Sequence, residues 1–267
     1  MLRAGSEPLD CMFLEALATT PTGRVPRHRT RLGRMPSAPL SLLLASASPA
    51  RRSTLRAAGV DPLVQVSSVD EDAVVAAAQD VAGGPLEAAD VALLLARAKA
   101  EDVVAALEVD DTFGEADADL PHGILVLGCD SVLELDGEVH GKPADAVEAA
   151  ARWRRMRGGT GVLHTGHWLV DLRDTDAGGS GGMVGGTAST TVHFADLDDA
   201  EVDAYVATGE PLRVAGAFTL DGLGGPYVSG IEGDPSNVIG VSLPLLRELV
   251  RELGVAWHDL RTPVGDA

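Results

Sequence analysis

The sequence predicts an α/β fold in which a mixed β-sheet is flanked by helices. Two observations lead to this prediction. Short apolar runs of strand length alternate with longer segments of helical period, which is typical of α/β proteins. The pair Asp136-Gly137 stands between two apolar runs and is a strong hairpin signal, so antiparallel strands should accompany parallel ones. The 267 residues, 45% of them hydrophobic, are enough for one large domain of this class.

Proline, serine and glycine delimit the elements of the first half. Leu42-Leu43-Leu44 predicts a buried strand, and Ser48 followed by Pro49 is an N-cap with proline at the first helical position. Gly59 should end that helix. We expect strands at 42–44, 64–67 and 124–127, helices at 49–58 and 85–107, and an acidic loop at 108–122.

The second half begins with the hairpin around Asp136-Gly137. An arginine-rich helix should follow, and then two strands joined by a connection at 174–187. Six of the nine residues from 178 to 186 are glycine, but the Lys-Ser/Thr ending of a phosphate loop is missing, so we expect a flexible hairpin connection there. The expected elements are helices at 144–157, 198–208 and 244–253, strands at 162–172 and 188–194, and a turn-rich stretch at 210–237.

The two ends of the chain differ from its middle. Residues 1–38 lack a sustained period and carry arginines among prolines, so we expect a disordered extension, with Met35 as a candidate start of translation. A basic arm that binds a partner is the alternative. The folded domain should span 39–258, followed by a tail at 259–267.

Composition restricts the partners and the compartment. A formal charge of −19 and an aromatic content of 3% disfavour binding to nucleic acid, which needs basic surface and base-stacking side chains. Two cysteines cannot form a disulfide framework. No apolar stretch reaches the roughly 18 residues of a membrane span, and the N-terminus lacks the order of a secretory signal. We therefore expect a cytoplasmic protein without membrane contact.

The first candidate site lies where the strand at 42–44 turns into the helix. Ser46 and Ser48 can donate from their hydroxyls, Arg51 and Arg52 can grip phosphate oxygens, and the free N–H groups of a helix start favour anions. This segment therefore predicts a phosphate site. An ordinary N-cap with two exposed arginines is the alternative.

Carboxylates and lysines complete the predicted chemistry. Asp70-Glu71-Asp72 and Asp130 each follow a predicted strand, and such carboxylates can share Mg²⁺ or Mn²⁺ with substrate phosphates, although the first group could also be a solvated loop. Lys99 and Lys142 are the only lysines among 21 basic residues, which favours a site that needs compact point charges. Neither zinc-ligand spacing nor a nucleophile elbow is present. The set predicts a protein that handles phosphoryl groups with a metal ion and water.

These motifs resemble the Maf family of nucleoside triphosphate pyrophosphatases over residues 42–253. The family's most specific stretch is matched by GCDSVLELDGEVHGKP at 128–143, and its opening signature by LLLASASPARR at 42–52. Further similar blocks are Val69-Asp70-Glu71, ARAKA at 96–100, TGEPLRVAGAF at 208–218 and GIEGDPSNVIGVSLPLL at 230–246. The resemblance implies a Maf/ITPase-like fold with the active site in a cleft between two lobes, and it is compatible with a homodimer.

The resemblance also implies a reaction and a role for each candidate. A nucleoside triphosphate would be hydrolysed to the monophosphate and pyrophosphate, with Asp130 as proton acceptor for the attacking water. Glu71 and Asp130 would hold the divalent cation, Lys99 and Lys142 would offset charge on the leaving pyrophosphate, and Ser46, Ser48, Arg51 and Arg52 would bind phosphates.

Substrate preference does not transfer from the resemblance. The branch of the family that acts on thymidine and uridine triphosphates has a lysine where this chain has Arg213-Val214, and a glutamine where it has Asp221. Asp221 could accept a hydrogen bond from a base or stabilise a turn. Modified nucleotides are therefore candidate substrates. The alternative function is a noncatalytic nucleotide-binding regulator of septum formation, which would not need Asp130 beside Glu71 and two lysines.

Overall fold

The computed structural model describes residues 40–109 and 123–261, all within one compact unit that spans Ser37–Ala267. The predicted extension at 1–38, most of the acidic loop at 108–122 and the end of the tail at 259–267 lie outside the described residues. Within the described part, no helix is long and apolar enough to cross a membrane.

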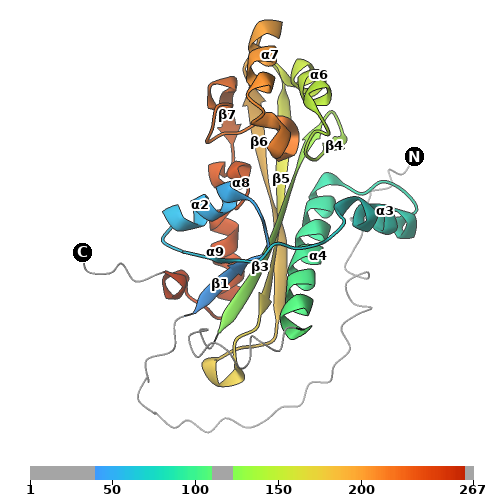
Figure 1. The fold of residues 1–267 in the computed structure, drawn as a ribbon. Coiled ribbons are helices and arrows are strands. Elements are labelled where there is room, and N and C mark those ends of the chain that lie inside the picture. The colour runs from blue at the N-terminus through green and yellow to red at the C-terminus, as the bar shows by residue number, and fades with distance from the viewer. Residues whose placement is uncertain (1–39, 110–122, 262–267) are drawn as a thin grey trace, which may run out of the picture. The chain divides into compact units, whose positions relative to one another are not determined.

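A seven-stranded mixed sheet forms the centre of the described unit (Figure 1). Its strands are β1 (Ser41–Leu44), β2 (Leu63–Val64), β3 (Ile124–Leu135), β4 (Glu138–His140), β5 (Thr160–Asp171), β6 (Met183–Phe194) and β7 (Val228–Glu232). The order is β2-β1-β3-β5-β6-β7, with β4 paired to β3. The β2-β1-β3 pairs are parallel and the others antiparallel. The prediction of a mixed sheet flanked by helices is confirmed.

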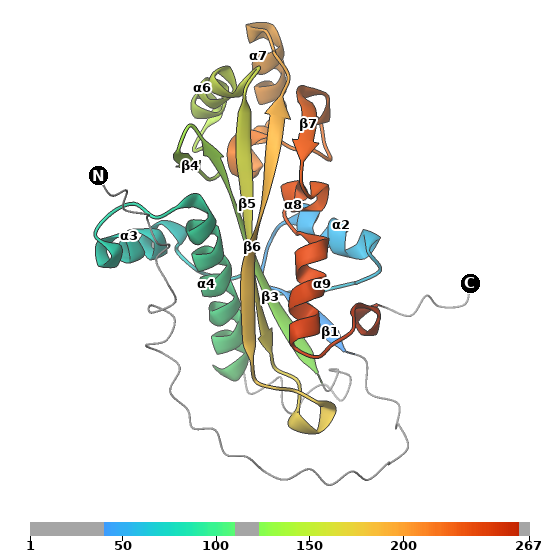
Figure 2. The same ribbon diagram turned by 180° about the vertical axis from the view of Figure 1, so that it is seen from behind.

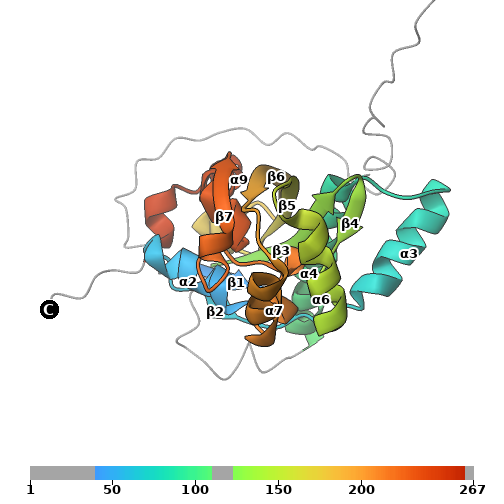
Figure 3. The same cartoon turned by 90° about the horizontal axis from the view of Figure 1, so that it is seen from above.

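Helices cover both faces of this sheet (Figures 2 and 3). They are α2 (Pro49–Ala57), α3 (Glu71–Ala82), α4 (Ala88–Val109), α6 (Ala146–Met156), α7 (Asp199–Ala207), α8 (Pro235–Ile239) and α9 (Leu243–Glu252). Of these, α3 lies outside α4, away from the strands (Figures 2 and 3). Successive residues of a strand point to opposite faces, so Leu125 and Leu127 of β3 pack with α9, whereas Val126 packs with α4.

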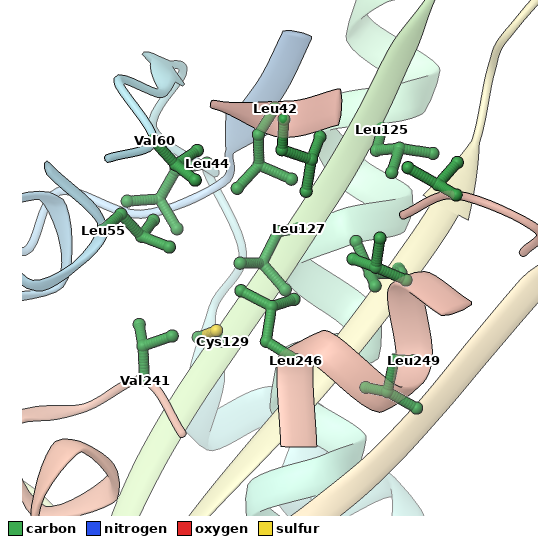
Figure 4. Packing of buried hydrophobic residues seen from close by; sticks show 14 of the residues in the cluster. Leu42, Leu44, Leu55, Val60, Leu125, Leu127, Cys129, Val241, Leu246 and Leu249 are labelled. Atoms are coloured by element: carbon green, nitrogen blue, oxygen red, sulfur yellow. The ribbon is translucent and has the colours of Figure 1, made fainter. Parts of the chain in front are cut away.

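The two largest hydrophobic clusters of the described residues lie along the same long strands. The first gathers side chains of β1, β3, α2 and α9 (Figure 4). The second surrounds Trp153 of α6, whose ring makes edge contacts with Phe194 at 5.7 Å and Tyr205 at 5.4 Å. Because β3, β5 and β6 have 12 residues each, they extend from one core to the other and hold the two at a fixed distance.

The β3–β4 hairpin forms as its sequence predicts. Asp136 and Gly137 have φ of 53° and 79°, and two positive φ values in a two-residue loop match the twist of the flanking strands. Leu135 pairs with Glu138 across this turn. The hairpin thereby directs the chain after β4 back along the edge of β3.

Four predicted boundaries were wrong. The expected strand at 124–127 continues to Leu135, so Asp130 lies within β3 and not after its end. The expected strand at 64–67 is only Leu63–Val64, and the expected turn-rich stretch at 210–237 contains β7 and the start of α8. The glycine-rich connection ends earlier than predicted, because β6 begins at Met183 and includes Gly185. A Cβ at Gly185 would lie 2.2 Å from the Trp168 ring, so this glycine makes room for the indole instead of loosening the chain.

Candidate active site

The candidate site lies at a gap along one edge of β3. The pairing of β1 with β3 ends at Leu44 and Leu127, and that of β4 begins at Leu133. Residues 128–132 of β3 therefore have no strand beside them on this edge within the described residues. The segments after β1 and after β4 meet over the gap and line a cavity of about 1320 Å³. Of the predicted site residues, Ser46, Ser48, Arg51, Glu71, Lys99, Asp130, Lys142 and Asp221 all line it.

Arg51 is the buried centre of one wall. Its Nε donates to the carbonyl of Gly240 at 3.0 Å, its Nη1 to the Ser46 hydroxyl at 2.9 Å and its Nη2 to the Ser131 hydroxyl at 3.0 Å. All three acceptors are neutral, and no carboxylate within 40–109 or 123–261 forms an ion pair with this guanidinium. Its positive charge is therefore fixed in place without a direct counter-ion.

The serines around Arg51 complete the turn from β1 into α2. Ser48 is the N-cap, and its hydroxyl accepts from the Arg51 N–H at 3.4 Å while Pro49 occupies the first turn. The Ser46 hydroxyl accepts from the Ser48 N–H at 3.2 Å as well as from Arg51. Since Ser46 accepts twice, its own O–H remains a donor. The segment thus presents a hydroxyl, a guanidinium and a helix start to one cavity, which is a suitable environment for an anion.

Lys99 and Asp130 meet because α4 lies very close to the sheet. A Cβ at Gly128 would stand 2.0 Å from the Ala96 carbonyl, so only glycine permits this approach of helix to strand. The Lys99 ammonium then lies 2.5 Å from Asp130 Oδ1. The two side chains are only 12% and 9% exposed, so this ion pair is largely removed from water.

Glu71 is the second carboxylate on the Lys99 ammonium. It lies 2.7 Å from Lys99 Nζ and belongs to the first turn of α3, whose N-cap is Asp70. The sequence analysis did not predict α3, which has no fully buried residue but packs its half-buried Val74 and Val75 against α4. The acidic run 70–72 is thus a helix start that carries one carboxylate into the cavity.

Burial acts differently on the two carboxyl groups. Burial raises the pKa of Asp130 and outweighs the opposing charges of Lys99 and Arg51. Burial also raises the pKa of Glu71, but the hydrogen bond and charge of Lys99, with the charges of Lys142 and Arg51, hold that pKa below its ordinary value. Asp130 is therefore the group that favours proton uptake, and Glu71 the one that stays ionised.

Lys142 is held in place through its backbone. The loop after β4 is fixed by Arg152 of α6, a buried residue whose Nη1 donates to the Gly141 carbonyl at 2.6 Å. Glu148 binds the same guanidinium at 2.5 Å and accepts from the Ala144 N–H at 2.8 Å. The Lys142 side chain is exposed and forms no hydrogen bond or ion pair with any described residue. Its ammonium is thus available at the cavity wall.

One predicted residue does not reach the cavity. Arg52 is exposed on α2 and is absent from the cavity lining, because adjacent residues of a helix point about 100° apart and Arg51 already faces inward. Sequence reasoning also missed Ser131, which contacts Arg51, and Arg152 and Glu210, which hold cavity loops. These three bind partners at least 11 residues away, which local motifs do not reveal.

The donor set allows a divalent cation only together with a ligand. Glu71 and Asp130 supply carboxylate oxygens, which Mg²⁺ and Mn²⁺ prefer, and both point to the place that the Lys99 ammonium occupies. No cluster of three or more metal-binding side chains was found in the part of the chain that the structure describes. Since Mg²⁺ commonly takes one or two carboxylates plus phosphates and water, the residues fit an ion that arrives with a phosphate-bearing substrate.

Comparison with known proteins gives concordant results. Residues 41–253 match the family model described as Maf-like protein. The chain is 52% identical to a nucleoside triphosphate pyrophosphatase of Salinispora tropica, over 82% of this chain and 86% of the relative. It is 50% identical to one of Leifsonia xyli, over 85% and 99%. A third, from Streptomyces coelicolor, is 52% identical over 84% of this chain and 96% of its own length.

Proposed function

This chain belongs to the Maf-like protein family, and on that basis we propose that it is a nucleoside triphosphate pyrophosphatase. In the proposed reaction a water oxygen bonds to the α-phosphorus of a nucleoside triphosphate. The bond between that phosphorus and the α–β bridging oxygen breaks. The products are a nucleoside monophosphate and pyrophosphate.

The observation that carries the proposal is the meeting of Arg51, Lys99, Asp130 and Glu71 at one unpaired strand edge. Among the described residues Arg51 has neutral partners, and it presents its charge to the cavity, so it is suited to bind the polyphosphate. Ser46 donates its hydroxyl beside it. In a chain with a net charge of −19, Arg51 thus supplies a positive charge that the carboxylates of the cavity do not pair with directly.

Asp130 takes the proton of the attacking water in this proposal. A general base works best when its pKa is raised toward the operating pH, and burial shifts Asp130 in that direction. Lys99 donates to Asp130 and Glu71 and orients both carboxylates. Lys142 can offset the charge that develops on pyrophosphate, because its ammonium has no competing partner among the described residues.

We propose that Glu71 and Asp130 hold a divalent cation, Mg²⁺ or Mn²⁺, when the substrate is bound. When bound, such an ion would neutralise phosphate charge and polarise the bond to the α-phosphorus. The ammonium of Lys99 would then shift toward the phosphates, since two cations cannot share the space between the carboxylates.

The substrate range, partners and location are part of the same proposal. We infer that the substrates are (d)NTPs, with modified nucleotides included, because Arg213 and Asp221 in the cavity lining differ from the pattern of the pyrimidine-specific branch. We place the protein in the cytoplasm, where these nucleotides occur, and retain the homodimer and the absence of nucleic-acid binding as expectations. A regulator without catalysis is less well supported, since it needs no carboxylate pair on Lys99.

The test is a panel of ordinary and modified nucleoside triphosphates with Mg²⁺ or Mn²⁺, assayed for pyrophosphate, orthophosphate and monophosphate. In H₂¹⁸O the label should enter the monophosphate, because water attacks the α-phosphorus. Asp130→Asn should abolish turnover, whereas Glu101→Gln, an exposed carboxylate on the same helix as Lys99, should not change it. Release of orthophosphate, or label in pyrophosphate, would refute the regiochemistry.

A further inference from the structure

Glu210 is a carboxylate in the cavity lining that the proposed chemistry does not use. Its Oε1 accepts from the Tyr205 hydroxyl at 3.1 Å, from the Gly224 N–H at 3.1 Å and from the Thr219 hydroxyl. Its Oε2 accepts from the Leu223 N–H at 3.1 Å. One carboxylate therefore ties the end of α7 to both ends of the segment 219–224.

The donors to Glu210 are all neutral. No lysine, arginine or histidine within 40–109 or 123–261 forms an ion pair with it. Burial raises the pKa of Glu210, but the donors Thr219, Leu223, Gly224 and Tyr205 outweigh burial and lower it. Hydrogen bonds from the segment 219–224 thus keep Glu210 ionised. The same hydrogen bonds hold this segment in its conformation.

Glycines show how tightly this loop is wrapped. A Cβ at Gly222 would lie 2.7 Å from Glu210 Oε2, and one at Gly224 would lie 2.4 Å from the Tyr205 hydroxyl. Thr219 makes a further link, because its N–H donates to the Tyr205 hydroxyl at 3.2 Å. The loop has therefore been shaped around the Glu210–Tyr205 pair, which we call the loop clamp.

The clamped loop forms one wall of the cavity, and its chemistry is suited to a nucleobase. Leu220, Leu223 and neighbouring Phe218 line the cavity with apolar surface, and Leu223 is 58% exposed. Asp221 in the same wall is an acceptor that would repel phosphate but could bind a ring N–H or an exocyclic amine. A wall of apolar side chains with one acceptor matches a flat heteroaromatic ring.

We propose that Glu210 is a positioning residue for nucleobase recognition: through the loop clamp it sets the placement of the wall 219–224 that selects the base. This proposal rests on the proposed function. Glu210 makes no contact with Arg51, Lys99 or Asp130, so its loss should disturb selection of the base and leave the handling of phosphates intact.

Glu210→Gln is the direct test. Glutamine puts an amide NH₂ where one carboxylate oxygen stood, and this group faces a backbone N–H or a hydroxyl, so at least one link of the clamp is lost. Across the nucleotide panel, the ratio of kcat/KM between the best and the poorest base should fall about tenfold or more, mainly through KM for the best base. Inhibition by inorganic tripolyphosphate, which has no base, should change less than about threefold.

Two further variants keep the result interpretable. Tyr205→Phe removes one donor from the clamp and should lower the same ratio by a smaller factor, which serves as the test if Glu210→Gln does not fold. Glu201→Gln weakens the capping box at the opposite end of α7 and does not touch the loop, so it should leave base selection unchanged. Thermal unfolding of each variant establishes that it is folded.

The outcomes separate this proposal from the proposed function. An unchanged base ratio in Glu210→Gln and Tyr205→Phe, or an equal loss for every nucleotide and for tripolyphosphate, would overturn the role of Glu210. Failure of the wild type to release pyrophosphate from any nucleotide would instead refute the proposed function. In that case the ratio of nucleotide dissociation constants, measured by calorimetry, tests the clamp without catalysis.

Discussion

Replacing Asp130 by asparagine should inactivate the protein and at the same time make it slightly more stable. Asparagine keeps the shape of the side chain and an oxygen for Lys99, but it carries no charge. Burial raises the pKa of Asp130 even beside Lys99 and Arg51, so the folded state disfavours its ionised form. Lys99 would keep Glu71 at 2.7 Å as its partner and would not be left unpaired.

The difference in the free energy of unfolding between Asp130→Asn and the wild type depends on pH, because only the wild type carries an ionisable group at this position. Below the ordinary pKa of 3.8, the carboxyl group is protonated in folded and unfolded chains, and the two proteins should be equally stable. As pH rises above this value, the unfolded chain ionises first, so the wild type loses stability until the raised folded pKa is passed. Neutralising a buried ion is often neutral or stabilising by about 1–4 kcal/mol, and we expect about 1 kcal/mol because Lys99 remains satisfied.

Urea unfolding of both proteins at several pH values measures this difference. A gain of about 1 kcal/mol corresponds to a rise in Tm of roughly 2–4 °C for a domain of this size. The advantage of the variant should be larger at pH 8 than at pH 4.5, and pyrophosphate release should be lost at both. A variant that is less stable than the wild type at pH 8 would show that the Lys99–Asp130 pair stabilises the fold, and the argument from burial would fail.

Three other predictions concern Lys99, the loop that carries Lys142, and α3. Lys99→Met should cost about 2–3 kcal/mol in urea unfolding because it leaves Asp130 buried without a partner, whereas the double variant with Asp130→Asn should recover most of this stability and no activity. Arg152→Lys should lower kcat about tenfold with little change in KM, because the Gly141 carbonyl loses its hydrogen bond and Lys142 is no longer fixed. Steady-state kinetics measures this effect, and a circular dichroism spectrum equal to that of the wild type shows that the variant is folded. Amides of α3 should exchange with deuterium faster than those of α4, since α3 has no buried residue. Addition of nucleotide with Mg²⁺ should slow the exchange of the α3 amides. Equal exchange rates in the two helices would contradict the prediction.

Local signals in the sequence were enough to predict much of the fold. Ser48 and Pro49 mark the start of α2, and Asp136-Gly137 marks the β3–β4 turn, because each of these residues acts on its own backbone. The helix α3 was missed although Asp70 is its N-cap and Gly83 its C-cap. The acidic run 70–72 was interpreted only as a metal-binding or solvated segment, and α3 has no fully buried side chain that would mark an apolar face. Gly185 was misjudged for a related reason: its role is to accommodate the Trp168 ring on a neighbouring strand.

The residues of the candidate site also fall into two groups, those that the sequence predicted and those that only the structure identified. Ser46 and Arg51 stand at the turn from β1 into α2, where residue type and position already indicate chemistry. Asp130 was singled out for the same reason, although it lies within β3 and not at its end. Arg152 and Glu210 act by holding loops from other parts of the chain, so their sequence context shows only a helix and a turn. Such loop-holding residues can be identified only from the distances in the structure. They determine how precisely the residues that act on the substrate are positioned.

The charges of the cavity suggest how binding and catalysis are separated. Lys99 is neutralised by two carboxylates, whereas Arg51 is bound to neutral oxygens and pairs with no carboxylate in the described part of the chain. Burial, together with the charge of Arg51, lowers the pKa of His167 to about 4. His167 therefore stays neutral and accepts from the Ser242 N–H at 2.9 Å, which leaves Arg51 as the buried cation on its side of the strand edge. We infer that Arg51 interacts with the phosphates as soon as they bind. Lys99 instead stays with Asp130 and Glu71 until a bound cation takes its place between them, so its charge reaches the phosphates only in the complete complex of protein, substrate and cation.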